Sequence, residues 1–271
     1  MEFQMLNKTF ISSMVGIAAA VAVAGSASAT IVVDNFSSGN LSLGGTTATF
    51  ANINANDVST SASYLPVAGS ANRRRMQAFA SASAAGFGFG PTMTSRVDVT
   101  SGNAAIALNG GSYYGSSWSG VLMSASFDYG TDDFSSGQSV DLSAMTSANI
   151  LGSGSLSVTS GAIPKVDVSM MLNSGSATRT WTMSSSAGAI GNVAFSLNSG
   201  FTAGGSGTFS YANVTSVRFA FSFSGTGAYA STQSGAGAFS YNLSQFNFVP
   251  APGALALLGV AGLAGARRRR A

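Results

Sequence analysis

Three aspartates, Asp128, Asp132 and Asp133, form the densest acidic group of the chain, in the segment FDYGTDDF. Carboxylates on a loop are the hard oxygen ligands that Ca²⁺ prefers, so these residues are the candidates for a metal site. Their spacing lacks the D-x-D-x-D-G order of a complete calcium loop, and Asp and Gly are also ordinary turn residues. A polar turn between strands is therefore the simpler interpretation, with a structural calcium as the alternative.

Three aromatic residues, Tyr113, Tyr114 and Trp118, lie in the Gly/Ser-rich segment GGSYYGSSWSG. Aromatic rings on such a segment can stack on the apolar C–H face of a sugar, which makes these residues the candidate glycan contacts. The alternative is that they pack back into a core, as we expect for Trp181. They therefore suggest a carbohydrate ligand without excluding a structural role.

Arg73, Arg74 and Arg75 form the one charge run inside the body of the chain. Guanidinium groups bind phosphate and acidic polysaccharide, but a charge run is more often a solvated face. No aromatic platform lies nearby in the sequence to support a ligand. We therefore expect a solvated loop here.

The composition argues against an enzyme. The chain has no histidine and no cysteine, and its single glutamate is Glu2, so the usual general bases and thiol nucleophiles are missing. Asp132 and Asp133 are adjacent, and adjacent residues on a strand point to opposite faces. We predict no catalytic residues and no cofactor. A glycosidase that uses aspartates alone is the remaining enzyme class.

The elements that must position these residues follow a period of two. Val217, Phe219, Phe221 and Phe223 alternate with Arg218 and small residues, which predicts a strand with its odd positions facing a core. Similar patterns predict strands at 31–36, 41–50, 76–82, 96–100, 104–108, 121–129, 156–159, 166–173, 179–183, 193–197, 208–211 and 239–248.

Glycine-containing groups at 44–45, 109–111, 199–200, 204–205 and 224–225 are expected to form the turns between strands. Many short strands without a long 3.6-residue period predict an all-β fold, an antiparallel β-sandwich in one domain over residues 30–248. One or two helical turns are expected at 141–148. The net charge of +3 comes from the terminal arginines, so the body offers no basic surface for nucleic acid.

Residues 1–29 have the layout of a secretory signal peptide. Lys8 precedes an apolar run over 10–25, and Ala27 and Ala29 supply the small residues that signal peptidase requires before a cut after Ala29. A retained membrane anchor is the alternative. The run is shorter than the ~20 apolar residues of a typical transmembrane helix, which favours cleavage.

Residues 249–271 read as a sorting tail. Val249, Pro250, Pro252 and Gly253 precede an uncharged apolar run, and Arg267, Arg268, Arg269 and Arg270 follow it. At ~1.5 Å per residue, a helix over 253–266 falls short of a ~30 Å hydrocarbon core. The arginines would stay cytoplasmic under the positive-inside rule. The segment would therefore hold the chain in the membrane only temporarily. The alternatives are a helix that packs on the body and a basic tail that binds nucleic acid.

This tail resembles the PEP-CTERM sorting signal of Gram-negative and related bacteria, with Ala251 where that family usually has glutamate. The resemblance implies that an exosortase-type membrane protease processes the chain. It also implies an association with exopolysaccharide, biofilm or the outer surface. The body resembles jelly-roll domains of the carbohydrate-binding type. That resemblance implies a first strand at 31–36 beside the last strand, and often a structural calcium.

These observations predict an exported, non-enzymatic protein that resides transiently in the inner membrane and then at the envelope surface or outside the cell. Its expected role is structural or adhesive, and its expected partners are signal peptidase, the exosortase-type protease and exopolysaccharide. A lectin-like carbohydrate-binding module is the alternative. The low charge and the Gly/Ser/Ala-rich texture also fit a filament or surface-layer subunit.

Overall fold

The computed structural model describes residues 29–37, 39–47, 53–60, 73–84, 93–112, 118–130, 139–158, 162–227 and 234–251. These residues form strands, short connections and one 3₁₀ turn, Tyr211–Asn213. None of the helical structure in them is long and apolar enough to cross a membrane. The expected signal peptide up to residue 28 and the expected tail after Ala251 lie outside the described residues.

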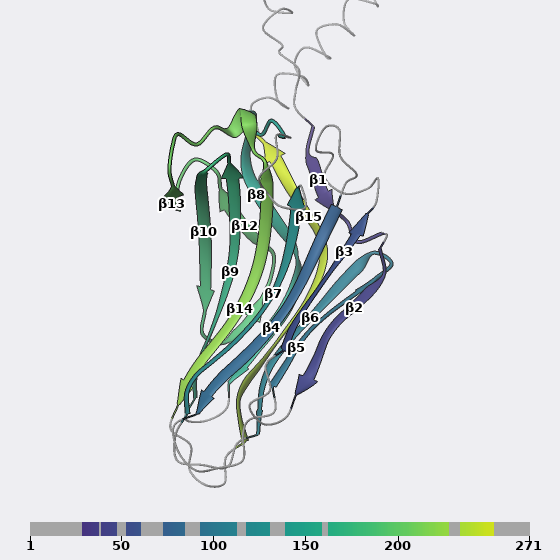
Figure 1. Ribbon diagram of the computed structural model, residues 1–271, viewed down its shortest axis with the longest axis vertical. Coiled ribbons are helices and arrows are strands. Elements are labelled where there is room, and N and C mark those ends of the chain that lie inside the picture. Colours follow the sequence, from purple (N-terminus) through teal and green to yellow (C-terminus); the bar gives the residue numbers. More distant parts are fainter. Residues whose placement is uncertain are drawn as a thin grey trace, which may run out of the picture.

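The strands form two antiparallel sheets (Figure 1). The eight-stranded sheet consists of β1 (Ile31–Asp34), β2 (Leu41–Thr47), β5 (Met93–Thr100), β6 (Asn103–Ser112), β8 (Met145–Val158), β11 (Gly188–Ile190), β12 (Val193–Ser196) and β15 (Ser234–Pro250). The seven-stranded sheet consists of β3 (Ile53–Thr60), β4 (Arg73–Ala84), β7 (Trp118–Gly130), β9 (Ala162–Ser174), β10 (Ala177–Ser185), β13 (Phe201–Gly205) and β14 (Ser216–Gly227).

The strand order is that of a jelly roll. In one sheet the order is β6-β15-β8-β11, and in the other it is β7-β14-β9-β10. The chain therefore crosses between the sheets in the way that two Greek keys require. β5 and β2 extend the first sheet beyond β6, and β4 and β3 extend the second beyond β7. The predicted antiparallel sandwich is confirmed.

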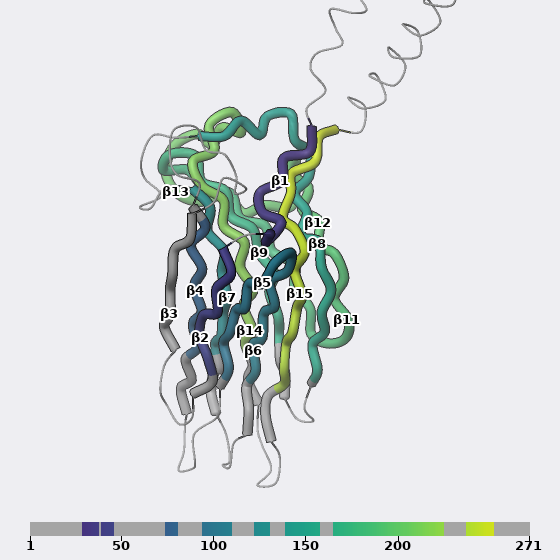
Figure 2. The backbone as a smooth tube through the Cα atoms, turned by 90° about the vertical axis from the view of Figure 1, so that its right-hand side faces the viewer, coloured from purple at the N-terminus to yellow at the C-terminus, as the bar shows by residue number. Residues whose placement is uncertain are grey.

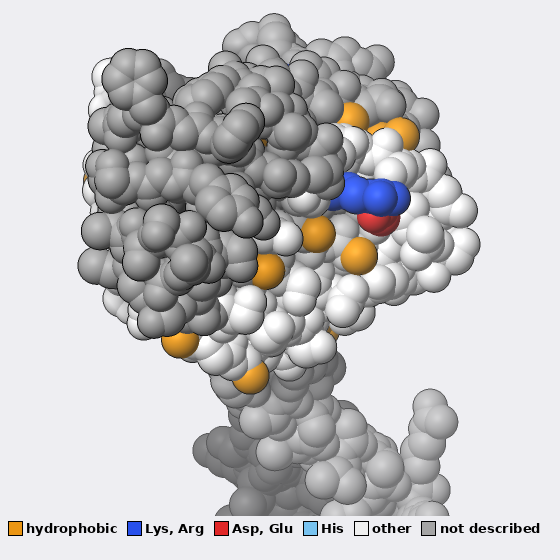
Figure 3. Space-filling view, turned by 90° about the horizontal axis from the view of Figure 1, so that it is seen from below, with side chains coloured by type: hydrophobic (Ala, Val, Ile, Leu, Met, Phe, Trp, Pro, Cys, Tyr) orange, Lys and Arg blue, Asp and Glu red, His pale blue; other side chains and the backbone are white. Residues whose placement is uncertain are grey.

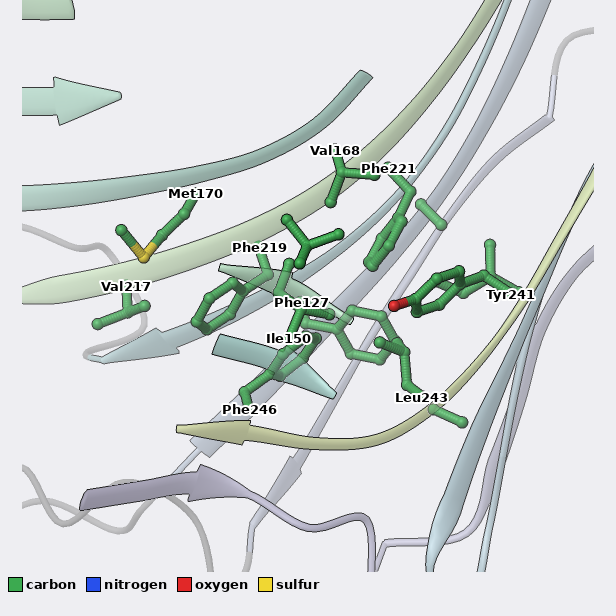
Figure 4. Packing of buried hydrophobic residues seen from close by; sticks show 14 of the residues in the cluster. Phe127, Ile150, Val168, Met170, Val217, Phe219, Phe221, Tyr241, Leu243 and Phe246 are labelled. Carbon is green, nitrogen blue, oxygen red and sulfur yellow. The ribbon is translucent and has the colours of Figure 1, made fainter. Parts of the chain in front are cut away.

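The core lies between the sheets, where the inward residues of β14 meet those of β15 (Figure 4). Phe219 and Phe246 stack with ring centroids 4.1 Å apart, and each fully buried Phe side chain stabilises the fold by about 1.5–3 kcal/mol. Tyr241 also points into this layer. A Cβ at Gly152 or Gly154 would collide with the backbone oxygen of Asn242 or Ser240 on β15, at 2.4 or 2.1 Å, and would also lie 2.7 or 2.6 Å from the Tyr241 ring. These positions of β8 therefore need glycine.

Two predicted elements are wrong. The residues 141–148 form no helix, because β8 begins at Met145 and lies between β15 and β12, where Ala148 pairs with Phe248 and with Phe195. Pairing on both sides overrides the local helical preference. The residues 208–211 form no strand either; they lead into the 3₁₀ turn.

Most of the expected glycine turns lie inside strands. The groups at 44–45, 109–111, 204–205 and 224–225 belong to β2, β6, β13 and β14, and only the pair at 199–200 lies in a turn between strands. Gly44 shows the reason. Its φ is +84°, and a Cβ there would collide with the carbonyl oxygen of Ser95 on the neighbouring strand. Glycine here permits an irregular, closely paired strand and not a hairpin turn.

The two ends of the described chain leave the sandwich at one pole, which we call the terminal pole. Ile31 of β1 pairs with Phe248 of β15, and the two strands run side by side in Figure 2. This pairing confirms that the first and last strands are neighbours. β15 continues through Val249 and Pro250, so the first two residues of the expected tail are part of the sheet.

Candidate functional site

The arginine run begins β4 and is not a solvated loop. Arg74 faces the interior with its side chain fully buried, and its Nη1 lies 2.9 Å from Asp34 Oδ2. The Tyr129 hydroxyl donates to the same oxygen at 2.9 Å, and the Phe36 amide donates to Oδ1 at 2.7 Å. Burial is tolerated because the two charges pair and hydrogen bonds hold the carboxylate. This buried ion pair joins β1 to the opposite sheet.

A second cluster lies on the outward face of the seven-stranded sheet. The register aligns Arg75, Asp128 and Arg218 across β4, β7 and β14. Arg218 donates from Nε and Nη2 to the two oxygens of Asp128, and Arg75 Nε lies 3.3 Å from Oδ2. The Asp128 side chain is 0% exposed, whereas those of Arg75 and Arg218 are 26% and 37% exposed. The negative charge is therefore covered by two partly exposed cations.

A pocket of about 180 Å³ opens beside this cluster and is lined by Asp128, Met171, Asn173, Ser216 and Arg218. Asn173 Nδ2 donates to Ser216 Oγ at 2.6 Å. The other end of that amide, Oδ1, is buried and has no hydrogen-bond partner in the structure. Buried polar atoms without a partner are rare, so Asn173 Oδ1 is an uncommon unsatisfied acceptor in the wall of the pocket.

Of the three aspartates predicted from the sequence as metal candidates, the structure describes Asp128. Asp128 lies in the cluster, where both of its oxygens accept from arginines. Asp132 and Asp133 lie outside the described residues. Within the described part of the chain, no three His, Cys, Asp or Glu residues gather where they could hold a metal ion. The calcium expectation therefore gains no support from Asp128, whose carboxylate is already bound.

The aromatic and sorting candidates lie largely outside the described residues, which do not include Tyr113, Tyr114, Ala27, Pro252, Gly253 and Arg267 to Arg270. Trp118 is the first residue of β7, paired with Ala84 and with Gly227. Ala29 precedes β1. Trp181 is buried as expected, and its Nε1 donates to the carbonyl of Ser196 at 2.8 Å.

Sequence reasoning missed the pocket residues Met171, Asn173 and Ser216. The alternation along 217–223 does place Arg218 on the outward face, but it does not say which residues of other strands adjoin it. Met171 pairs with Arg218, and Asn173 pairs with Ser216, through the register of β9 against β14. No local sequence signal indicates that these residues lie next to Asp128.

Arg179 sits in a separate aromatic cluster at the edge of the seven-stranded sheet. Its guanidinium carbon lies 4.1 Å from the ring centroid of Phe201, 4.6 Å from that of Phe209 and 4.9 Å from that of Tyr211. Rings can stabilise a guanidinium by about 0.5–2 kcal/mol through cation–π attraction. The arginine thus covers partly buried rings, which is a structural role.

The described surface at the pole opposite the termini carries few charged side chains. Apart from one basic patch beside one acidic group, the described surface there consists of backbone, small polar side chains and scattered apolar side chains (Figure 3). Paired charges such as Lys165 and Asp167, 2.9 Å apart, cancel each other on the sheet surface. Arg218, which lines the pocket, is likewise paired, with Asp128.

Comparison with known proteins adds little. No known protein family and no curated protein matches the chain. Among solved structures, it is similar to a family 11 carbohydrate-binding module from Clostridium thermocellum, solved with a β-1,3-1,4-mixed-linked tetrasaccharide. The identity is 13%, the TM-score is 0.33, and the match covers 83% of this chain and 98% of that one. A TM-score this low does not define a shared fold, so the architecture rests on the strand order above.

Proposed function

We propose that this protein is a non-catalytic, exported β-sandwich that binds a polysaccharide through the pocket beside Asp128. The supporting observation is the pocket itself, whose lining combines the donors of Arg218 and the hydroxyl of Ser216 with the side chain of Asn173, and the buried Oδ1 of that side chain has no hydrogen-bond partner in the structure. A sugar hydroxyl both donates and accepts. It can therefore pair with the hydroxyl of Ser216 while accepting from a guanidinium.

The size and lining of the pocket suit a sugar better than a single water. About 10–15 Å³ of such volume admits one water molecule, and this pocket has about 180 Å³. Met171 contributes an apolar wall against which the C–H face of a sugar can lie, and the polar groups stand on β-strands. Rigid polar groups around an apolar wall are typical of small-molecule sites.

The same geometry favours binding over catalysis. Among the described residues, Asp128 is the one carboxylate that lines the pocket, and both of its oxygens accept from arginines. Hydrolysis of a glycosidic bond usually needs two carboxylates on opposite sides of that bond. A carboxylate engaged in this way cannot easily act as a base. The role that follows is adhesive: attachment of the protein to matrix polysaccharide.

Export and sorting complete the proposal. Signal peptidase would cut after Ala29, and an exosortase-type protease would cut near Pro252, before the apolar run. Because β1 and β15 lie side by side, both cuts would fall at the terminal pole. The intact mass of protein recovered from the cell surface tests this part: a mass that still includes Arg267 to Arg270 would contradict it.

The binding test uses the purified full chain on a panel of neutral and acidic polysaccharides. We expect binding, and an affinity about 5- to 100-fold lower for Asn173→Leu, because that change replaces a polar lining residue and removes the donor that orients the Ser216 hydroxyl. Asn149→Leu is the matched control: it removes the amide that donates to Asn247 at 3.1 Å on the outward face of the other sheet. No binding to any polysaccharide, or equal loss in both variants, would refute the proposed site.

A further inference from the structure

We infer that the polysaccharide is neutral and that it continues from the pocket across β10 to β13, where Thr178, Thr180 and Thr202 bind further sugar residues. This inference rests on the proposed function and names both the class of ligand and the direction in which it lies. It follows from the balance of charges in the lining of the pocket, from the uncharged surface on one side of it, and from three threonine hydroxyls on that surface.

The charges that line the pocket cancel. Among the described residues, the lining contains one cation, Arg218, and one anion, Asp128, and hydrogen bonds from Nε and Nη2 join the guanidinium to both carboxylate oxygens. Arg75 lies on the far side of Asp128, on β4, and does not line the pocket. A close pair of opposite charges attracts a third charge only weakly, because the two contributions oppose each other. The pocket therefore favours a ligand that is recognised by hydroxyl groups and carries no charge.

The surface on the side of the pocket away from Asp128 is uncharged. In that direction the sheet continues from β9 to β10 and then to β13, and both strands are described throughout. β13 has no charged residue, and the only one on β10 is Arg179. Arg179 is two residues from the buried Trp181, so both face the inner side of the sheet, whereas Thr178 and Thr180 face outward. A neutral chain that leaves the pocket in this direction meets no charge on either strand.

Three threonines continue the pocket across this surface. Thr178 and Thr180 stand opposite the pocket residues Asn173 and Met171 in the register of β10 against β9. Residues that face each other in this way have Cβ atoms about 4.5–5.5 Å apart. Thr202 stands opposite Thr180, one strand farther out on β13. The three side chains therefore lead from the edge of the pocket to the edge of the sheet.

The hydroxyls of these threonines are free to bind a ligand. Within the described part of the chain, none of the three takes part in a hydrogen bond, whereas the hydroxyl of Thr215 donates to the backbone oxygen of Asn173 at 3.2 Å. Gly204 stands opposite Thr178, and a Cβ there would lie 2.7 Å from Thr178 Oγ1. Glycine thus leaves this hydroxyl uncovered. A free hydroxyl can donate to one sugar hydroxyl and accept from another.

The class of ligand is tested by binding of the full chain to a neutral β-glucan, a galactan and a mannan, each before and after carboxymethylation. We expect one neutral polymer to bind at least about 5-fold more tightly than its carboxymethylated form. Its affinity should change less than about 2-fold between low and high salt, because no net charge attracts it. Tighter binding of a carboxymethylated polymer would overturn the neutral class and leave the proposed function standing. Binding of none of the six polymers would overturn both.

The direction is tested by threonine-to-valine variants, which remove a hydroxyl and keep the β-branched shape that suits a strand. Thr180→Val and Thr202→Val should each lower the affinity for the neutral polymer about 2- to 10-fold. Thr182→Val is the matched control, because Thr182 also faces outward on β10 but stands opposite Ser169, which does not line the pocket.

Two results would overturn the direction and leave the proposed function standing. One is a loss in Thr182→Val as large as that in Thr202→Val, which would place the polymer along β10 and not across it. The other is unchanged binding in both Thr180→Val and Thr202→Val while Asn173→Leu still weakens binding, which would confine the ligand to the pocket.

Discussion

The buried pair of Arg74 and Asp34 gives the most demanding test of the fold. Replacing Arg74 by Met keeps an unbranched side chain, although a shorter one, and removes the charge, so Asp34 is left buried without its cation. Breaking a buried pair in this way costs about 3–5 kcal/mol. Asp34 keeps the Tyr129 hydroxyl and the Phe36 amide as donors, which places the expected loss near 3 kcal/mol.

Urea unfolding, followed by tryptophan fluorescence, measures this loss. A domain of this size changes its Tm by about 2–4 °C per kcal/mol, so the same variant should also melt roughly 6–12 °C lower. Arg96→Met is the control. It breaks a pair whose side chains are 52% and 30% exposed, and such pairs contribute about 0–1 kcal/mol.

The double variant Asp34→Leu/Arg74→Met tests whether the lost stability comes from the unpaired carboxylate or from altered packing. Replacing both charges by apolar side chains removes the stranded carboxylate but leaves the Tyr129 hydroxyl and the Phe36 amide without their acceptor, so this variant should recover only part of the stability lost in Arg74→Met. A loss below about 1 kcal/mol for Arg74→Met, equal to that of the exposed control, would refute the reasoning. It would mean that water or another group compensates Asp34.

The remaining predictions concern the core and the sheet edge. Gly154→Ala should lower the unfolding free energy by at least about 1–3 kcal/mol, because its Cβ would lie 2.1 Å from the backbone oxygen of Ser240 and 2.6 Å from the Tyr241 ring. Gly191→Ala, with open space around its Cβ, should be neutral in the same denaturation assay. Burial raises the pKa of Tyr241 from 10.0 to about 12, so the folded state favours the protonated phenol. The stability that depends on the protonated phenol is complete below pH 10 and is lost as the pH rises to about 12. The alkaline decline in Tm should therefore be smaller in Tyr241→Phe, and an unchanged decline would count against the assignment. Arg179→Met should cost about 1–2 kcal/mol by loss of the cation–π contacts, and a thermal melt identical to that of the parent chain would contradict this.

Much of the fold was predictable because alternation is a local signal. The positions of Phe219, Phe221 and Phe223 between polar residues predict which face of β14 is buried, and all three are buried. The strand at 145–158 was only partly predicted, because its first half reads as a short helix. Its pairing with strands far along the chain decides otherwise.

The candidate site was much less predictable. Asp128 was selected as a calcium candidate for its neighbours in sequence, but its actual partners come from strands far away: Arg218 is 90 residues from it and Arg75 is 53 residues from it. Arg74 was expected in solvent because a charge run is usually solvated. Its burial depends on Asp34, 40 residues earlier, and sequence alone does not reveal that pairing.

The sequence by itself determined the all-β class, the inward faces of the main strands, and the absence of histidine and cysteine chemistry, because these depend on residue type and on spacing within one strand. The tertiary structure decided which charges are buried in pairs, which cations remain exposed, and where Asn173 lacks a donor. Those properties depend on the register between strands that are distant in the chain. A shift of one residue would turn every such side chain to the other face of the sheet.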